Sequence, residues 1–188
     1  MSGNQEQLAV LFADISGSSD IYERLGDERG RRAIAQCVAN MTKNLAAFQG
    51  ALIKVTSDEV MCTFPSAELA FHAACAMQDA LENNRYIDGE PMHIRIGFHY
   101  GEVARESGDV FGDTVNLAAR VAAKTRANQI LVTQAVVAAL PPALGAKTRR
   151  IERAELKDQQ AQYQIYMVIW SSEEKMNARV GSAAQRKS

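Results

Sequence analysis

Short apolar runs and longer amphipathic stretches alternate along the chain. Residues 8–12 form an apolar run that ends at Ala13 and Asp14 and is followed by small polar residues, which predicts a buried strand that opens into a loop. Farther along, apolar residues recur at spacings of four and three between Asp27 and Gly50, so they form one stripe on a long helix. The residues of this stripe are Ile34, Val38, Met41, Leu45 and Phe48.

The next segment predicts a hairpin and a second helix. Residues 51–55 and 60–64 are two short apolar strands joined by a tight turn around Ser57 and Asp58, which presents Asp58 at an edge of the sheet. A helix follows from Ser66 to the asparagines at positions 83 and 84. Residues 92–100 then alternate between apolar and polar, as a strand does.

The remainder predicts a helix at 114–124, a strand at 129–132, a short helix from Thr133 and a last strand at 163–170. The order of elements is therefore strand, helix, hairpin, helix, strand, followed by further helices and strands. This order predicts an α+β fold with a ferredoxin-like βαββαβ core, in which helices cover one face of a mostly antiparallel sheet.

Length and composition favour one domain. The chain has 188 residues, of which 47% are hydrophobic, enough for one packed core. We expect residues 1–7 to be an N-terminal extension, 8–170 to be the folded domain, and 171–188, which are small and polar, to be a flexible tail. The polar segment 83–90 is a connecting loop in this interpretation.

Charge and cysteine usage exclude several classes of function. The chain has 21 basic and 22 acidic residues, so no broad positive field favours nucleic acid. The three cysteines form no CxxC pair, which argues against a zinc site or a disulfide framework and suits a reducing cytoplasm. No apolar run approaches the roughly 18 residues of a spanning helix and no leader opens the sequence, so we expect no membrane contact for this chain, although a longer parent protein could carry membrane or regulatory domains.

Asp14 and Asp58 are the first candidates for chemistry. Each lies where an apolar strand meets a turn, and both are expected to emerge at the same end of neighbouring strands. Two carboxylates in this position could hold two magnesium ions. The alternative is that each is an ordinary turn or cap residue, since aspartate is favoured in such positions.

Phosphate binding has three further candidates. The backbone amides of residues 16–19 could cradle phosphates at a helix start. Lys54, on an otherwise apolar strand, either extends to solvent or meets a ligand. Asn116 and Arg120 lie four residues apart on one face of a helix beside small alanines, which suits a polyphosphate; the alternative is a solvated face with Arg120 paired to a carboxylate.

Four motifs resemble the class III adenylyl and guanylyl cyclases in order and spacing. They are FADISGS at residues 12–18, KVTSDE at 54–59, RIG at 95–97 with GEV at 101–103, and GDVFGDTVNLAAR at 108–120. The resemblance covers roughly residues 8–168, because LK at 156–157 and the closing strand are similar to the end of that domain. Two positions depart from the family pattern: Ser57 stands where members usually have a glycine, and Ser18 stands where they often have an aromatic residue.

The resemblance implies a complete catalytic site and an activity. It makes Asp14 and Asp58, together with the Ile15 carbonyl, the ligands of two divalent cations, Mg²⁺ or Mn²⁺. Gly17 and Ser18, whose amides could cradle phosphates, are expected to bind the substrate. The other implied roles are base recognition for Lys54 and Asp109, ribose orientation and transition-state stabilisation for Asn116 and Arg120, and contact with the terminal phosphates for Lys157.

The implied reaction is conversion of ATP to cyclic AMP and pyrophosphate in a head-to-tail homodimer, with each site shared between two chains. Adenine offers an acceptor at N1 and a donor at N6, which match the donor Lys54 and the acceptor Asp109, whereas guanine reverses this pattern. Two alternatives remain: a guanylyl cyclase, and a module that binds nucleotide or dimerises without turnover. The three histidines show no HExxH spacing, which gives a zinc hydrolase little support.

Overall fold

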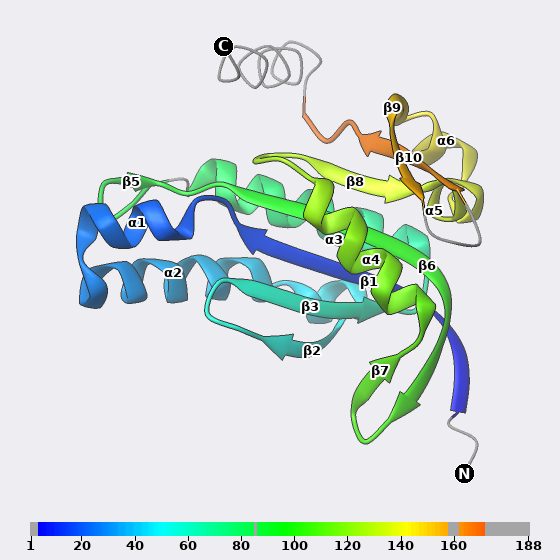
Figure 1. Ribbon diagram of the computed structural model, residues 1–188, viewed down its shortest axis with the longest axis horizontal. Coiled ribbons are helices and arrows are strands. Elements are labelled where there is room, and N and C mark those ends of the chain that lie inside the picture. The colour runs from blue at the N-terminus through cyan, green and yellow to red at the C-terminus, as the bar shows by residue number, and fades with distance from the viewer. Residues whose placement is uncertain (1–3, 85, 158–161, 172–188) are drawn as a thin grey trace.

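The computed structural model describes residues 4–84, 86–157 and 162–171 of the chain, with only the backbone described for residue 86 and residues 152–157. The described residues form one large mixed sheet, a small separate hairpin and a set of helices (Figure 1). The predicted tail lies outside the described residues from position 172 onward. Among the described residues, no helix combines the length and the apolar character that crossing a membrane requires.

The main sheet has eight strands in the order β2-β3-β1-β6-β8-β10-β9, with the short β7 paired to β6. Among the described strands, only the β6–β8 pair is parallel, so the prediction of a mostly antiparallel α+β sheet is confirmed. The strands are β1 (Asn4–Ile15), β2 (Ala51–Val55), β3 (Glu59–Phe64), β6 (Ile94–Glu106), β7 (Asp109–Phe111), β8 (Ile130–Thr133), β9 (Thr148–Lys157) and β10 (Gln162–Val168).

The helices follow the predicted order with two additions, a helix at the start and a short last helix. Helix α1 (Ser18–Leu25) was not predicted as a separate element, and it is followed by α2 (Asp27–Thr42) and the 3₁₀ turn η1 (Leu45–Phe48). The remaining helices are α3 (Ala67–Asn83), α4 (Asp113–Lys124), α5 (Gln134–Ala139) and α6 (Pro142–Gly145). Between α3 and β6, the segment predicted as a loop contains the small hairpin β4 (Tyr86–Ile87) and β5 (Glu90–Pro91).

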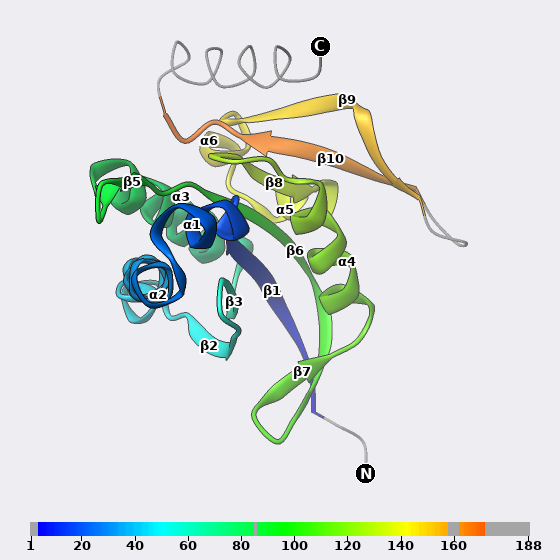
Figure 2. The same ribbon diagram turned by 60° about the vertical axis from the view of Figure 1, so that its left-hand side comes forward.

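The prediction that helices cover one face of the sheet is correct for most helices but wrong for α4. Side chains of β1 alternate: Ala9 and Leu11 join the main core with α2 and α3, whereas Val10 and Phe12 join a second core that includes Ala118 of α4. Figure 2 shows α4 on the side of the sheet opposite α2 and α3. A strand exposes alternate residues to opposite faces, so an apolar run without gaps, such as residues 8–13, is buried on both sides.

The long helix predicted between Asp27 and Gly50 is interrupted after Thr42. The Thr42 hydroxyl donates a hydrogen bond to the Val38 carbonyl at 3.1 Å, a pattern that competes with regular helical bonding. The apolar stripe then continues in η1, where Leu45 is buried. The stripe predicted from spacing is therefore real, although it belongs to two consecutive elements.

Candidate active site

Asp14 lies near the end of β1, in a row of charged residues that crosses three strands. The pairing register places it opposite Glu59 of β3 on one side and Arg95 of β6 on the other. Arg95 donates from Nε to Asp14 Oδ1 at 2.5 Å and from Nη2 to Oδ2 at 2.8 Å, a two-pronged contact that suits a guanidinium and a carboxylate. The hydrogen bond to Asp14 raises the pKa of Arg95, despite partial burial.

Asp58 is brought to the same place by the turn between β2 and β3. Its carbonyl oxygen accepts a hydrogen bond from the Ile15 amide at 3.0 Å, which ties the turn to the end of β1. Its carboxylate accepts a bond from the Ser18 hydroxyl at 2.8 Å and a longer one, at 3.5 Å, from the Ser57 hydroxyl. The structure therefore brings together the two aspartates that the sequence placed at ends of neighbouring strands.

Negative charge is concentrated at this edge. Partial burial, followed by the nearby charges of Asp14 and Asp58, raises the pKa of Glu59 above its usual value, while Arg95 opposes the shift. A site with surplus carboxylate charge suits a cation. Arg95 and Glu59 were not predicted as functional residues, because their proximity to Asp14 depends on a strand register that the sequence alone does not reveal.

The donor set fits a hard divalent cation that keeps part of its shell as water or substrate oxygen. Within the described ranges, no group of three or more His, Cys, Asp or Glu side chains is arranged to hold a metal ion. Two carboxylates and a backbone oxygen are what Mg²⁺ commonly takes from a protein when phosphate oxygens complete its coordination. Each ionised carboxylate oxygen has two lone pairs, so both aspartates can accept a further partner beside their present hydrogen bonds.

The predicted phosphate loop connects β1 to α1. Gly17 has φ 70°, in the left-handed region that favours glycine, and it turns the chain directly into the helix that begins at Ser18. The Ser16 amide donates to the His93 carbonyl at 2.8 Å. The expectation that residues 16–19 all present amides to a phosphate is therefore wrong for Ser16, whose amide holds the loop against the chain.

Lys54 and Asp109 form an ion pair, with 2.7 Å between Nζ and Oδ2. The pair joins β2 to β7, because β6 and β7 form a hairpin that returns toward β2 (Figure 1). The hydrogen bond from Lys54, then that from the Val110 amide, lowers the pKa of Asp109. The sequence left two alternatives for Lys54, extension to solvent or contact with a ligand. Its side chain is 57% exposed, which agrees with the first, and its ammonium group pairs with the Asp109 carboxylate of the same chain.

Asn116 and Arg120 lie on α4, away from the buried side of that helix. The buried residues of α4 are Thr114, Leu117, Ala118 and Val121, whereas Asn116 is exposed and Arg120 is half-buried. On a helix with 3.6 residues per turn, positions 116 and 120 lie on the side opposite 114, 118 and 121. Both residues are therefore directed away from the sheet that carries Asp14.

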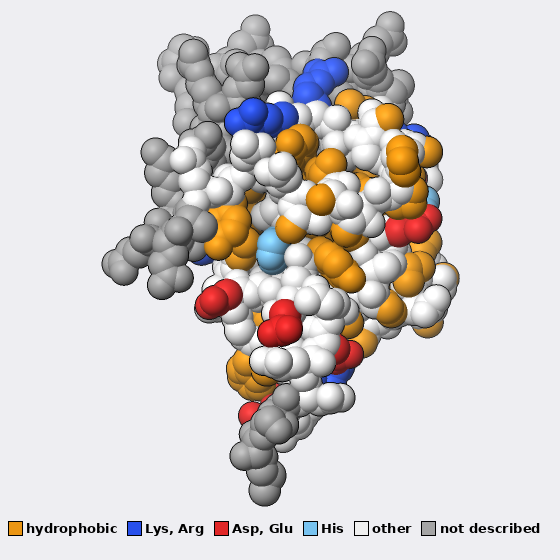
Figure 3. All heavy atoms as spheres, turned by 90° about the vertical axis from the view of Figure 1, so that its right-hand side faces the viewer, with side chains coloured by type: hydrophobic (Ala, Val, Ile, Leu, Met, Phe, Trp, Pro, Cys, Tyr) orange, Lys and Arg blue, Asp and Glu red, His pale blue; other side chains and the backbone are white. Residues whose placement is uncertain are grey.

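Lys157 ends β9, opposite Gln162 of β10, and its side chain lies outside the described part of the structure. The predicted site residues thus occupy the end of β1, the turn into α1 and its first residue, the β2–β3 hairpin, β7, α4 and β9. In Figure 3, hydrophobic and uncharged groups cover most of the face shown, with acidic side chains lower down and basic ones most prominent at the top. Among the described residues on that face, basic side chains are few and no broad basic surface forms.

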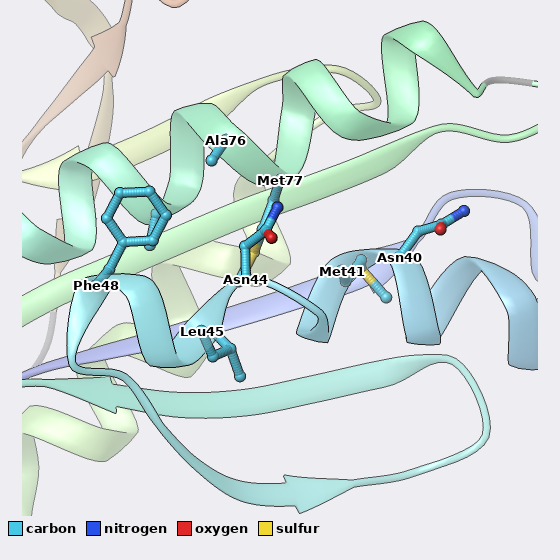
Figure 4. A pocket seen from close by; sticks show the side chains of 8 residues that line it. Asn40, Met41, Asn44, Leu45, Phe48, Ala76 and Met77 are labelled. Carbon is cyan, nitrogen blue, oxygen red and sulfur yellow. The ribbon is translucent and has the colours of Figure 1, made fainter.

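One small hollow lies elsewhere, between α2, η1 and α3, where Met41, Phe48 and Met77 line it (Figure 4). It contains none of the predicted site residues, and its lining is largely apolar. The polar groups described above, rather than this hollow, form the candidate site.

Comparison with known proteins gives consistent matches. Residues 1–180 match the family described as "Adenylate and Guanylate cyclase catalytic domain". An adenylate cyclase of Streptomyces coelicolor is 30% identical over 129 residues, which cover 69% of this chain and 33% of that protein. Adenylate cyclase 2 of Rhizobium meliloti is 29% identical over 171 residues, covering 81% of this chain and 47% of that protein. The chain therefore spans less than half the length of these two relatives.

A solved structure supports the fold. The adenylyl cyclase CyaB from P. aeruginosa superposes with a TM-score of 0.76 at 21% identity, covering 92% of this chain and 98% of that one. At this identity, the similarity establishes the α+β architecture alone.

Proposed function

The chain belongs to the adenylate and guanylate cyclase catalytic domain family, and from that premise we propose that it converts ATP to 3′,5′-cyclic AMP and pyrophosphate. The observation that carries the choice of ATP is the ion pair between Lys54 and Asp109. Lys54 can donate to adenine N1 and Asp109 can accept from the N6 amino group. Guanine presents a donor at N1 and an acceptor at O6, so both contacts would be repulsive.

The two aspartates and the Ile15 carbonyl are the groups that would hold divalent cations, which the family generally uses. When bound, the ions lower the pKa of the ribose 3′-hydroxyl and neutralise charge on the phosphates. Two observations support a shared task for Asp14 and Asp58: the Ile15 amide donates to the Asp58 carbonyl at 3.0 Å, and the charges of both aspartates raise the pKa of Glu59. The backbone amides of Gly17 and Ser18 would contact the phosphates where α1 begins.

The remaining residues orient the substrate and stabilise developing charge. Asn116 would fix the ribose so that the 3′-oxygen points at the α-phosphorus. Arg120 would face the negative charge that grows on the α-phosphoryl oxygens, and loss of such a donor commonly lowers kcat by about 10²–10³-fold. Lys157 would bind the terminal phosphates. No protein nucleophile is needed.

The position of α4 supports a site shared by two chains. Asn116 and Arg120 are directed away from the sheet that carries the aspartates of the same chain. A second copy, related by a twofold axis, would bring its α4 to these aspartates and would complete two equivalent sites.

Three exposed hydrophobic side chains also fit this arrangement. Among the described residues, the most exposed large hydrophobic side chains are Leu52 and Val55 on β2 and Phe111 on β7, each about half exposed, and they flank the Lys54–Asp109 pair. We therefore propose a head-to-tail homodimer. The three cysteines of each chain are free thiols, which suits a reducing cytoplasm.

A direct comparison of ATP with GTP tests the function. The purified chain is incubated with each triphosphate and Mg²⁺ or Mn²⁺, and cyclic nucleotides are quantified. We expect cyclic AMP to form, to disappear in excess chelator, and to exceed cyclic GMP by about tenfold or more. Faster formation of cyclic GMP would establish a guanylyl cyclase, and tight nucleotide binding without product would establish an inactive module.

A further inference from the structure

The carboxylate of Asp58 is held from outside its own hairpin. Ser18 Oγ donates to Asp58 Oδ2 at 2.8 Å, and the two residues are 40 positions apart in the chain. Ser18 is the first residue of α1, directly after Gly17, whose left-handed conformation sends the chain from β1 into the helix. The hydroxyl thus reaches Asp58 because of a backbone turn that the fold fixes.

The Asp58 carboxylate accepts fewer strong side-chain hydrogen bonds than the Asp14 carboxylate does. Arg95 engages both oxygens of Asp14. In the described part of the chain, the side chains that donate to Asp58 are those of Ser18 and Ser57, and the Ser57 contact, at 3.5 Å, is at the limit of a hydrogen bond. Ser18 is therefore the main side-chain restraint on this carboxylate.

This restraint matters because Asp58 belongs to a turn and has acidic neighbours. The preceding residue, Ser57, is exposed, and Glu59 follows with a pKa raised partly by the charge of Asp58 itself. A carboxylate in such a turn can rotate about its terminal torsion and away from other negative charges. The bond from Ile15 to the Asp58 carbonyl fixes the backbone, whereas the bond from Ser18 fixes the side chain.

We propose that Ser18 is a positioning residue whose hydroxyl orients the Asp58 carboxylate for a divalent cation. With Oδ2 occupied by the hydroxyl, Oδ1 is the oxygen that is left with only a weak partner, and it is the one presented to the cation. The inference rests on the proposed function, because it assigns Asp58 to cation binding. It differs from the phosphate-binding role of the Ser18 backbone amide, because here the side chain acts through Asp58.

Three variants separate the hydroxyl from the surrounding helix. Ser18→Ala removes the donor, Ser18→Thr keeps it, and Ser19→Ala makes the same chemical change at the next, exposed position of α1. Mn²⁺ binding is measured by electron paramagnetic resonance in the presence of 3′-deoxy-ATP, which lacks the attacking hydroxyl, with Asp58→Ala as the reference for loss of the carboxylate. Urea unfolding of each variant shows that it is folded.

We expect Ser18→Ala to weaken Mn²⁺ binding by about 10–100-fold, as is typical when a residue that orients a metal ligand is lost. The Mn²⁺ affinity of Ser18→Thr should stay within about threefold of the wild type. Ser19→Ala, which leaves the backbone amide in place, should bind Mn²⁺ as the wild type does. In steady-state kinetics, Ser18→Ala should raise the Mn²⁺ concentration needed for half-maximal rate by a similar factor, with little change in KM for ATP at saturating Mn²⁺.

Several results would overturn the inference. Unchanged Mn²⁺ binding in folded Ser18→Ala would show that the hydroxyl does not orient Asp58, and equal losses in Ser18→Ala and Ser18→Thr would show that the hydroxyl is not the cause. A rise in KM for ATP alone would make Ser18 a substrate ligand instead. If the wild type binds Mn²⁺ through Asp58 but makes no cyclic nucleotide, the proposed function fails while the variants still decide the role of Ser18. Mn²⁺ binding that is insensitive to Asp58→Ala would reject the inference.

Discussion

Replacing Gly97 with alanine should displace α4 and, with it, two proposed catalytic residues. Gly97 lies in the middle of β6, paired with Phe12 of β1 and Leu131 of β8. A Cβ atom at this position would lie 2.4 Å from the Ala122 amide nitrogen and 2.5 Å from its Cα. These are backbone atoms of α4, so no side-chain rotation can relieve the overlap.

The size of the effect follows from these distances. Ordinary van der Waals contact begins at 3.4 Å, so α4 must move from the sheet by about 1 Å, the order at which overpacking becomes costly. Overpacking of a core typically costs about 1–3 kcal/mol of stability, and a rigid backbone neighbour favours the upper end. A misplacement of about 1 Å can also lower a rate by roughly 10²-fold, because Asn116 and Arg120 move with the helix.

The assay pairs urea unfolding with cyclic AMP production. Gly97→Ala should lower the free energy of unfolding by about 3 kcal/mol and should lower kcat by more than its loss of folded protein explains. Gly145→Ala is the matched control, because a Cβ atom there would meet nothing within 4 Å. A Gly97→Ala variant with an unchanged free energy of unfolding, and with kcat within about twofold of the wild type, would refute the packing argument.

Two further predictions concern charge. Lys54→Glu combined with Asp109→Cys should lower kcat/KM for ATP by about tenfold or more and admit GTP, because both hydrogen-bond polarities are inverted; an unchanged preference for ATP in the folded variant would show that other groups read the base. Burial lowers the pKa of His99 from 6.5 to about 4, so the unfolded chain binds more protons between these values. The stability that the neutral imidazole contributes, about 3 kcal/mol, should be present above pH 6.5 and lost as the pH falls toward 4; a His99→Gln variant with the same pH dependence of unfolding would contradict this assignment.

Local patterns predicted most elements because their signals are local. The hairpin of β2 and β3 is bounded by residues that favour turns. Helix α3 begins directly after Ser66, whose side chain accepts a bond from the Leu69 amide as an N-cap residue does. Several elements were missed, and the two longest of them lack such signals. Helix α1 has only eight residues and buries only Ile21, and β9 contains charged residues at successive positions, so it lacks apolar alternation.

Contacts across the sheet could not be predicted, because they depend on register. The pairing of β1 with β6 places Arg95 beside Asp14, and it requires both strands to be aligned over their full lengths. The contact of Lys54 with Asp109 requires the β6–β7 turn, where Ser107 and Gly108 both have positive φ. The order of motifs predicted the candidate site residues, whereas the fold determines which of them are in contact.

The central claim, that each catalytic site combines groups from two chains, is tested most directly by mixing two inactive variants. One chain carries Asp14→Ala and Asp58→Ala, and the other carries Asn116→Ala and Arg120→Ala, so every site in either homodimer lacks one half. After random exchange, about half of the dimers are mixed and each has one complete site, so the mixture should recover roughly a quarter of wild-type activity per chain. A mixture that exchanges subunits and binds ATP but makes no cyclic AMP, or full activity from a proven monomer, would contradict the claim.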